Sequence, residues 1–290
     1  MKRRSFIQIA LAVVLLGSVS GVLAACGGDK GGTGQEHTIA VPSDTTNEAR
    51  ALLLLEANGI IKLKDGAGLT ATANDIIENP YNVKIIETEA AALPRTLPDV
   101  DFAVINGNYA LSAGLDASSV LVGESAASDA ALEYANIIAG KSGNEGSDKT
   151  RALVEVLQST EVQDFIAQSY SGAVVPVTVP SNLKSDGKAA ADKVIKVGAS
   201  PAPHAEILEF AKPLLAAKGY TLQIIEYSDY IQPNVALSEG ELDANYFQHL
   251  PYLEDYNKEN RTDLISVAKI HFEPLSLYPG KLASLDDLKK

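Results

Sequence analysis

The sequence predicts an α/β protein built on mostly parallel sheets, and three observations favour this class. Short β-branched runs alternate with helical stretches from His37 onward, the pattern of repeated β-α-β units. Apolar residues make up 46% of the chain and charged residues 21%, an ordinary globular composition that excludes a disordered or coiled-coil protein. The length of 290 residues suits one large domain or two of ordinary size.

The elements follow in order along the chain. Short apolar, β-branched runs predict strands at Thr38–Val41, Val83–Glu87, Phe102–Ile105, Ile137–Ala139, Ile195–Ala199, Leu222–Tyr227 and Leu264–Ile270. Helical spacing predicts helices at Asn47–Asn58, Thr150–Ser169, His204–Lys218 and, as a short one, Ser284–Lys289. Thr45 with Glu48 predicts a capping box at the first helix, and Gly219 a stop for the third. The segment Pro180–Asp192, rich in small and polar residues, predicts a linker.

The N-terminal residues have the pattern of a secretion signal. Residues 1–25 combine a basic start, an apolar run at Phe6–Val19 and a small-residue cleavage site, which together predict a secretory signal peptide. Cys26, the only cysteine, follows Leu-Ala-Ala and resembles the lipidated cysteine of a bacterial lipobox. The alternative is a buried free cysteine beside an ordinary cleavage site. The Gly-rich residues 26–36 then form a flexible tether.

The charge excludes one class of partner. Asp and Glu number 37 against 24 Lys and Arg, a net charge of −13. Because so acidic a surface repels phosphate backbones, we expect no nucleic-acid partner.

Two strand-to-helix turns, at Ile39–Arg50 and Ile195–His204, are the places to look for a ligand site, because helix N-termini present free N–H groups there. Arg50 lies early in the predicted helix, where a cation opposes the helix dipole. A bound carboxylate paired with both arms of the guanidinium would compensate for it. The alternative is a partner on the same turn, Glu48 or Asp44.

Aromatic and amide residues mark the other candidates. In Tyr246–Tyr252, an extended backbone places Phe247 and His249 on one face, with Tyr252 just beyond, and Tyr230 lies upstream. Such rings suit an apolar or thioether group, although they are equally consistent with an ordinary core. Asn106 and Asn136 end or interrupt apolar strands and could bind a zwitterion or cap loops.

Catalytic and metal motifs are weak. The stretch around Ser125 lacks the second glycine of a nucleophile elbow. His204, His249 and His271 have no short metal-ligand spacing. We therefore expect no enzyme activity, no metal and no cofactor.

Several motifs together resemble the methionine-binding lipoprotein family (MetQ/NlpA type), the substrate-binding components of ABC importers. They are Ser-Pro-Ala-Pro-His-Ala-Glu ending at Glu206, Asp229-Tyr-Ile-Gln-Pro-Asn, Ala244-Asn-Tyr-Phe-Gln-His-Leu-Pro-Tyr-Leu, Glu273-Pro-Leu-Ser-Leu-Tyr and Asp44-Thr-Thr-Asn-Glu-Ala-Arg. The resemblance covers nearly all of residues 37–178 and 193–290. In the family, the block matching 193–290 comes first, so this chain resembles a circular permutant.

The resemblance implies a two-lobed periplasmic-binding-protein-like fold (type II) with ligand between the lobes. It places residues 37–125, with 281–290, in lobe two, residues 126–178 and 193–280 in lobe one, and a permutation linker at 179–192. Crossovers are expected at Glu273–Gly280 and near Gly123–Tyr134.

It also implies roles for individual residues. Arg50 would bind the ligand carboxylate, Asn106, Asn136 and Asn47 the amino-acid backbone atoms, and Tyr230, Phe247, His249 and Tyr252 would surround the thioether. Tyr227 and His204 would be structural.

The resemblance further implies a monomer that is lipid-anchored, through a thioether at Cys26 and with palmitate, on the extracytoplasmic face of the cell membrane. It would deliver L-methionine to an ABC permease and its ATPase. The alternatives are a D-methionine or methionine-dipeptide binder, a lipid-anchored hydrolase using Ser125 and a histidine, and a metal-binding importer component.

Overall fold

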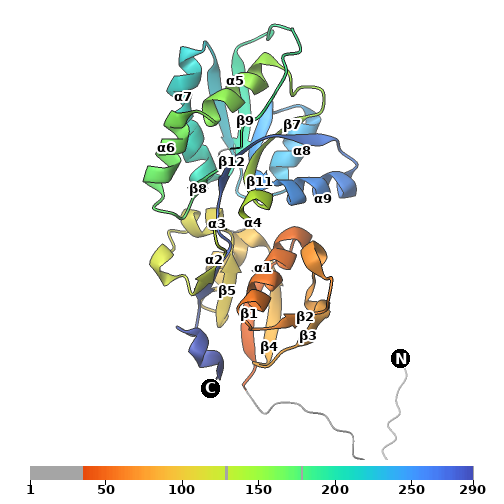
Figure 1. The fold of residues 1–290 in the computed structure, drawn as a ribbon, viewed down its shortest axis with the longest axis vertical. Helices are drawn as coiled ribbons and strands as arrows, with labels where there is room; N and C mark the ends of the chain where they lie inside the picture. Colours follow the sequence, from red (N-terminus) through yellow and green to blue (C-terminus); the bar gives the residue numbers. More distant parts are fainter. Residues whose placement is uncertain (1–34, 128–129, 178, 290) are drawn as a thin grey trace, which may run out of the picture. The chain divides into compact units, whose positions relative to one another are not determined.

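The computed structural model describes residues 35–127, 130–177 and 179–289. The predicted signal peptide, Cys26 and most of the predicted tether therefore lie outside the described residues. The unit from Gly34 onward holds two larger sheets and a two-stranded ribbon (Figure 1).

The first sheet has the strand order β4 (Val83–Thr88), β1 (His37–Pro42), β5 (Phe102–Ile105), β13 (Ser276–Pro279) and β6 (Val122–Gly123). The second has the order β10 (Thr221–Glu226), β9 (Val194–Ala199), β11 (Ala244–His249), β7 (Asn136–Lys141), β12 (Leu264–Phe272) and β8 (Val175–Pro176). The ribbon pairs β2 (Lys62–Leu63) with β3 (Ile76–Glu78). The helices are α1 (Thr45–Ala57), α2 (Leu93–Thr96), α3 (Gly107–Ser112), α4 (Ala130–Glu133), α5 (Asp148–Leu157), α6 (Thr160–Ser169), α7 (Glu206–Ala217), α8 (Gln232–Glu239) and α9 (Leu250–Asn260).

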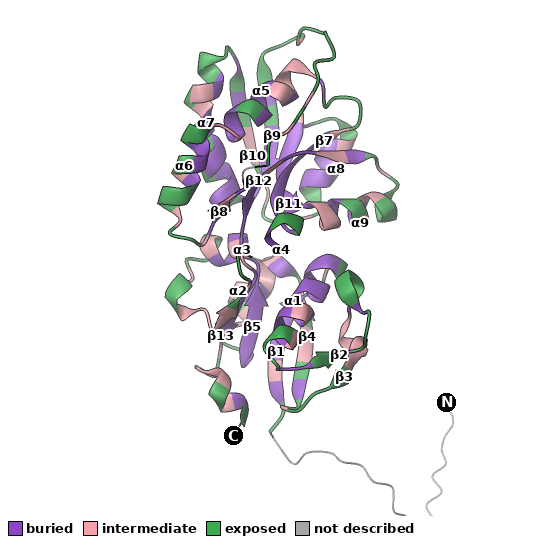
Figure 2. Ribbon diagram, viewed as in Figure 1, coloured by how far each residue is buried: buried purple, intermediate pink, exposed green. Residues whose placement is uncertain are grey.

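Helices cover both faces of each sheet, which confirms the α/β class. In the first sheet, α1 packs on one face and α2 and α3 on the other. In the second, α5, α6 and α7 pack on one face, and α8 and α9 on the other. Buried residues accordingly follow the strands and the inward sides of the helices (Figure 2).

The expectation of mostly parallel sheets is wrong, because each sheet is mixed. Parallel pairing joins β4, β1 and β5, and likewise β10, β9 and β11. Strands β7 and β13, each the first after the chain passes from one sheet to the other, pair antiparallel with their neighbours. A strand that arrives from the other sheet has no helical crossover within its own sheet to return it in the parallel direction.

One predicted helix is two. The sequence predicted a single helix over Thr150–Ser169, but α5 ends at Leu157 and α6 begins at Thr160. Ser159 starts α6 by accepting a hydrogen bond from the Val162 N–H, and a serine with this local bond favours a new N-terminus over helix continuation. The predicted short helix at Ser284–Lys289 is instead a 3₁₀ turn at Leu285–Lys289.

The cap of α1 also differs from the prediction. Asp44, not Thr45, is the N-cap, and its side chain accepts from the Asn47 N–H. Glu48 accepts from the Ala73 N–H rather than closing a capping box. The predicted end of α7 is confirmed, since Gly219 follows the helix with a φ of +83°.

The chain passes between the two sheets twice, between β6 and β7 and between β12 and β13. The predicted boundary at residue 280 is wrong, because β13 (Ser276–Pro279) pairs with β5 and β6 in the first sheet. The second passage is therefore only residues 273–275, and both passages lie beside α1, the helix that carries Arg50.

Candidate functional site

A small buried cavity lies where elements of the two sheets meet. Its volume is about 20 Å³, little more than one water molecule occupies. The residues that line it are Arg50, Asn106, Gly107, Asn108, Asn136, Tyr230, Phe247, His249 and Glu273. Six of the eight residues predicted to bind ligand are among them, and the other two, Asn47 and Tyr252, contact members of this set.

Arg50 is 4% exposed and is held from one side by an acid that the sequence analysis did not consider. Its Nε and Nη2 donate to the Glu124 carboxylate at 2.7 and 2.5 Å. Nη2 also donates to the Glu273 carbonyl at 3.0 Å, and the guanidinium lies 4.5 Å from the Tyr134 ring centroid. The expected same-turn partners, Glu48 and Asp44, bind backbone amides of other residues instead.

This arrangement determines which part of Arg50 remains for a ligand. Because Glu124 uses the Nε–Nη2 edge, Nη1 is left toward the cavity, 3.5 Å from His249 Nε2. The two-armed ligand contact expected from the sequence is therefore already made by Glu124. Nη1 is therefore the guanidinium nitrogen that faces the cavity.

A chain of amides orients Asn106. Asp44 Oδ1 accepts from the Asn47 backbone N–H and Nδ2 at 3.0 and 2.8 Å. Asn47 Oδ1 consequently accepts from Asn106 Nδ2 at 2.9 Å. Asn106 Oδ1 is then left as a buried acceptor with no partner among the described residues. Burying such an oxygen unpaired costs free energy, so it marks a binding position.

Asn136, at the start of β7, is already engaged. Its Oδ1 lies 2.9 Å from His204 Nε2. His204, which the sequence analysis assigned to structure, thus lies directly behind the cavity. Its Nδ1 has no hydrogen-bond partner in the part of the chain described.

The rings predicted to form a sleeve do lie together. The centroids of Tyr230 and Phe247 are 5.8 Å apart, and those of Phe247 and Tyr252 are 6.1 Å apart. Phe247 and His249 both line the cavity, as alternate residues of strand β11. Pro251 in the first turn of α9 places Tyr252 beside them, where its hydroxyl donates to the Tyr230 carbonyl at 3.0 Å.

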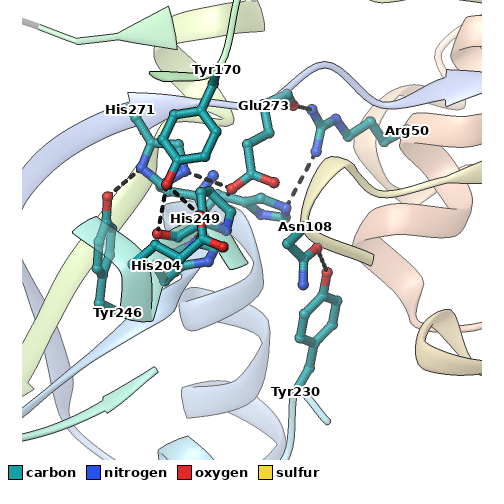
Figure 3. A network of polar contacts seen from close by, with 12 residues as sticks. Arg50, Asn108, Tyr170, His204, Tyr230, Tyr246, His249, His271 and Glu273 are labelled. Atoms are coloured by element: carbon teal, nitrogen blue, oxygen red, sulfur yellow. Dashed lines mark hydrogen bonds and ion pairs between the residues drawn. The ribbon is translucent and has the colours of Figure 1, made fainter. Parts of the chain in front are cut away.

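Glu273 is the main site residue that the sequence analysis missed. It is 5% exposed, and Oε1 accepts from His271 Nε2 at 2.6 Å and lies 3.4 Å from His204 Nε2 (Figure 3). Burial raises the pKa of Glu273 to about 7 and lowers the pKa of both His204 and His271 to about 3. Both imidazoles are therefore neutral at neutral pH.

Three further residues complete the site. Asn108 accepts from the Tyr230 hydroxyl at 2.6 Å, and its Nδ2 is unpaired among the described residues. Glu124 and Tyr134 hold Arg50 as described above. A signal existed for Asn108, which follows Asn106 and Gly107 directly after a buried strand. Glu124 and Glu273 could not be placed, because only the two passages between sheets bring them to α1.

The metal and hydrolase alternatives fit this geometry poorly. His204, His271 and Glu273 bring ligand atoms within 4.8 Å of one another, a set that could hold a cation. However, Nδ1 of His271 accepts from the Tyr246 hydroxyl while its Nε2 donates to Glu273, so both ring nitrogens of His271 are already engaged in hydrogen bonds. The third predicted ligand, His249, faces the Arg50 cation instead. Ser125 is exposed, whereas all four histidines are buried.

Comparison with known proteins shows which family this chain matches. The family model described as NlpA lipoprotein matches residues 34–178 and 195–290. The membrane lipoprotein TpN32 of Treponema pallidum is 44% identical over 137 residues, which cover 47% of this chain and 50% of that protein. The D-methionine-binding lipoprotein MetQ of Yersinia pestis is 41% identical over 140 residues, with 47% and 50% covered. The chain thus spans about half the length of the curated relatives it matches.

Among solved structures, a nutrient-binding protein of Burkholderia cenocepacia bound to methionine is 42% identical. The match covers 49% of this chain and 59% of that one, with a TM-score of 0.42. Within the described residues, none of the helices is long and apolar enough to cross a bilayer.

Proposed function

Because this chain belongs to the NlpA lipoprotein family, we propose that it is the lipid-anchored substrate-binding protein of an ABC importer and that it binds methionine. The ligand is held without covalent change between the two sheets and passed to the permease. The relative in Yersinia pestis that is named for methionine binding supports this ligand class.

The observation that carries the proposal is the chemistry of the cavity wall. Unpaired buried atoms of both kinds lie there: the acceptor Asn106 Oδ1 and the donor Asn108 Nδ2, beside the Arg50 Nη1 group. Phe247 and Tyr230 lie on the same wall. An α-amino acid with an apolar side chain supplies partners for all of these groups at once.

The proposed roles follow the contacts. Arg50 Nη1 and Asn108 Nδ2 bind the ligand carboxylate, and Asn106 Oδ1 accepts from the amino group. Asn47 orients Asn106, and Asn136 contributes through His204. Tyr230, Phe247, His249 and Tyr252 enclose the thioether, since sulfur packs well against ring edges.

Ligand entry requires movement, because a cavity of about 20 Å³ is far smaller than an amino acid. The chain passes between the sheets only at residues 124–135 and 273–275, and these two passages are the natural hinges. We propose that the sheets separate to admit ligand and close over it, and that the closed form docks on the permease.

The proposal extends to the parts of the chain outside the described residues and to its order. Residues 1–25 are removed, Cys26 carries the lipid, and residues 26–36 tether a monomer to the extracytoplasmic face of the membrane.

The permuted order is supported by Leu285 and Leu288, which pack in the same core cluster as Ile39 of β1. The end of the chain and its first strand therefore lie together, as a former covalent link requires.

Calorimetric titration of the protein, unfolded and refolded to remove endogenous ligand, tests the proposal. We expect saturable one-site binding of L-methionine, compared with D-methionine, a methionine-containing dipeptide and alanine. Preference for the D-isomer or the dipeptide changes the specificity but not the class. No binding by any member of the panel contradicts the proposal, and ester or peptide turnover that depends on Ser125 supports the hydrolase alternative instead.

A further inference from the structure

The Glu273 carboxylate is a buried acid that no cationic side chain pairs with. Among the described residues, its ion-pair contacts are His271 at 2.6 Å and His204 at 3.4 Å, and both imidazoles are neutral at neutral pH. Arg50 lies close, but its two-armed contact goes to Glu124, and it reaches Glu273 only at the carbonyl. Burying the ionised carboxylate in this way is costly, so without a nearby positive charge the group is partly protonated at neutral pH.

Glu273 also lines the cavity, and Figure 3 shows its side chain between His271 and Arg50. Oε1 is directed to the histidines, and Oε2 lies so close to Gly107 that a Cβ there would be 2.9 Å away. The position of Gly107 therefore lets the α3 backbone approach the acid. The Asn108 backbone N–H also donates to the carboxylate. An ionised carboxylate has about four acceptor sites, so these contacts leave capacity for one ligand donor.

The other polar groups of the cavity wall divide into hydrogen-bond donors and hydrogen-bond acceptors. Arg50 Nη1 and Asn108 Nδ2 are donors that suit a carboxylate. Asn106 Oδ1 is an acceptor whose orientation is dictated by the Asp44 and Asn47 chain, and Glu273 is the second acceptor. A primary ammonium group, with three N–H donors and one positive charge, satisfies both acceptors and neutralises the acid.

We propose that Glu273 is the counter-ion of the ligand's primary ammonium group and so determines that only ligands with a free α-amino group bind tightly. This inference rests on the proposed function, and it assigns Glu273 a specificity role. Without such a role, Glu273 only orders the histidine cluster.

The test crosses two ligands with three forms of the protein. The ligands are methionine and its deaminated analogue, in which hydrogen replaces the α-amino group. The proteins are the unmodified chain, Glu273→Gln and, as a matched control, Glu124→Gln, which neutralises the acid that holds Arg50. Affinities are measured by calorimetry, and circular dichroism checks that each variant folds.

We expect the unmodified chain to prefer methionine over the analogue by roughly 10- to 100-fold, the range for a charge-assisted hydrogen bond. Glu273→Gln lowers methionine affinity by a similar factor and changes analogue affinity less than about threefold. Glu124→Gln weakens both ligands together and keeps the preference. Equal losses for both ligands in Glu273→Gln overturn the inference while the proposed function stands. No methionine binding by the unmodified chain overturns both.

A measurement on the unmodified chain guards against misfolding of the variant. Since the pKa of Glu273 is about 7 without ligand, an ammonium ligand that favours the ionised form releases a proton when it binds below pH 7. The groups that face Glu273 are His204, His271, Arg50, Tyr246, Tyr170 and Tyr230. The pKa values of the three tyrosines are raised, so the tyrosines stay uncharged near pH 7, whereas Arg50 stays charged throughout this pH range. Methionine affinity should fall about tenfold relative to the analogue between pH 7.5 and 5.5, and parallel pH profiles contradict the inference.

Discussion

The Arg50–Glu124 pair can be separated experimentally into a folding role and a binding role. Both side chains are nearly buried, at 4% and 11% exposure. Arg50→Met removes the cation but keeps a chain of similar length. In the part of the chain that the structure describes, this leaves the Leu275 N–H, 2.9 Å away, as the one remaining hydrogen-bond donor to the Glu124 carboxylate. Adding Glu124→Gln removes the stranded charge and keeps an oxygen for that N–H.

The magnitudes follow from these contacts. Breaking a buried ion pair from one side costs about 3–5 kcal/mol, whereas replacing both partners by neutral groups is often nearly neutral. We therefore expect Arg50→Met to lower the free energy of unfolding by about 3–5 kcal/mol and the double variant to recover to within about 1 kcal/mol. Binding should not recover, because both variants lack Nη1, and methionine affinity should fall roughly 10- to 100-fold in each.

Urea denaturation measures the first quantity and calorimetric titration the second. Equal destabilisation by the single and double variants would show that Glu124 is not stranded by loss of Arg50. Normal methionine affinity in the double variant would remove Arg50 from the binding site, whatever its effect on stability.

Four other predictions concern packing, pH, specificity and chain order. Gly280→Ala should lower the free energy of unfolding by more than about 2 kcal/mol, because its Cβ would lie 2.3 Å from the Val100 carbonyl oxygen. The control is Gly140→Ala, whose Cβ would have no neighbouring atom closer than 3.9 Å. Equal melting curves for the two variants would refute the steric argument. Acidification from pH 6 to 5 should lower the free energy of unfolding by about 3 kcal/mol. Three buried histidines with lowered pKa values take up protons on unfolding, whereas Glu273, whose pKa is raised to about 7, releases one. A rise in the urea midpoint at pH 5 would contradict this prediction. Phe247→Ala should weaken methionine binding at least tenfold more than alanine binding, and a uniform loss would take Phe247 out of the thioether sleeve. Rejoining residue 290 to residue 37 and opening the chain within 179–192 should raise the melting temperature, and an unchanged value counts against a cost of permutation.

Much of the fold was predictable because the signals were local. The strand of β1 and the helix α1 follow from apolar periodicity, and the end of α7 from one glycine. The strand directions were not predictable, since they depend on which sheet each strand joins. The division of Thr150–Ser169 into two helices depended on one serine hydrogen bond that periodicity does not register.

The site shows the same division. Arg50, Asn106 and Phe247 lie next to strand or helix ends, where sequence patterns are informative, and the structure brings them to one cavity. Glu124 and Glu273 lie in the passages between the sheets, and their roles arise from contacts 74 and 223 residues distant from Arg50 in sequence. The sequence left open whether a ligand carboxylate or an acid on the same turn pairs with Arg50, whereas in the structure the partner is Glu124, 74 residues away.

Methionine binding through Arg50 is tested most directly by calorimetric titration of the refolded, ligand-free protein with L-methionine. The Arg50→Met/Glu124→Gln variant is measured in parallel. We predict one saturable methionine site in the unmodified chain and at least tenfold weaker methionine binding in the folded variant. Absence of heat in the unmodified chain, or identical isotherms for the two proteins, would contradict it.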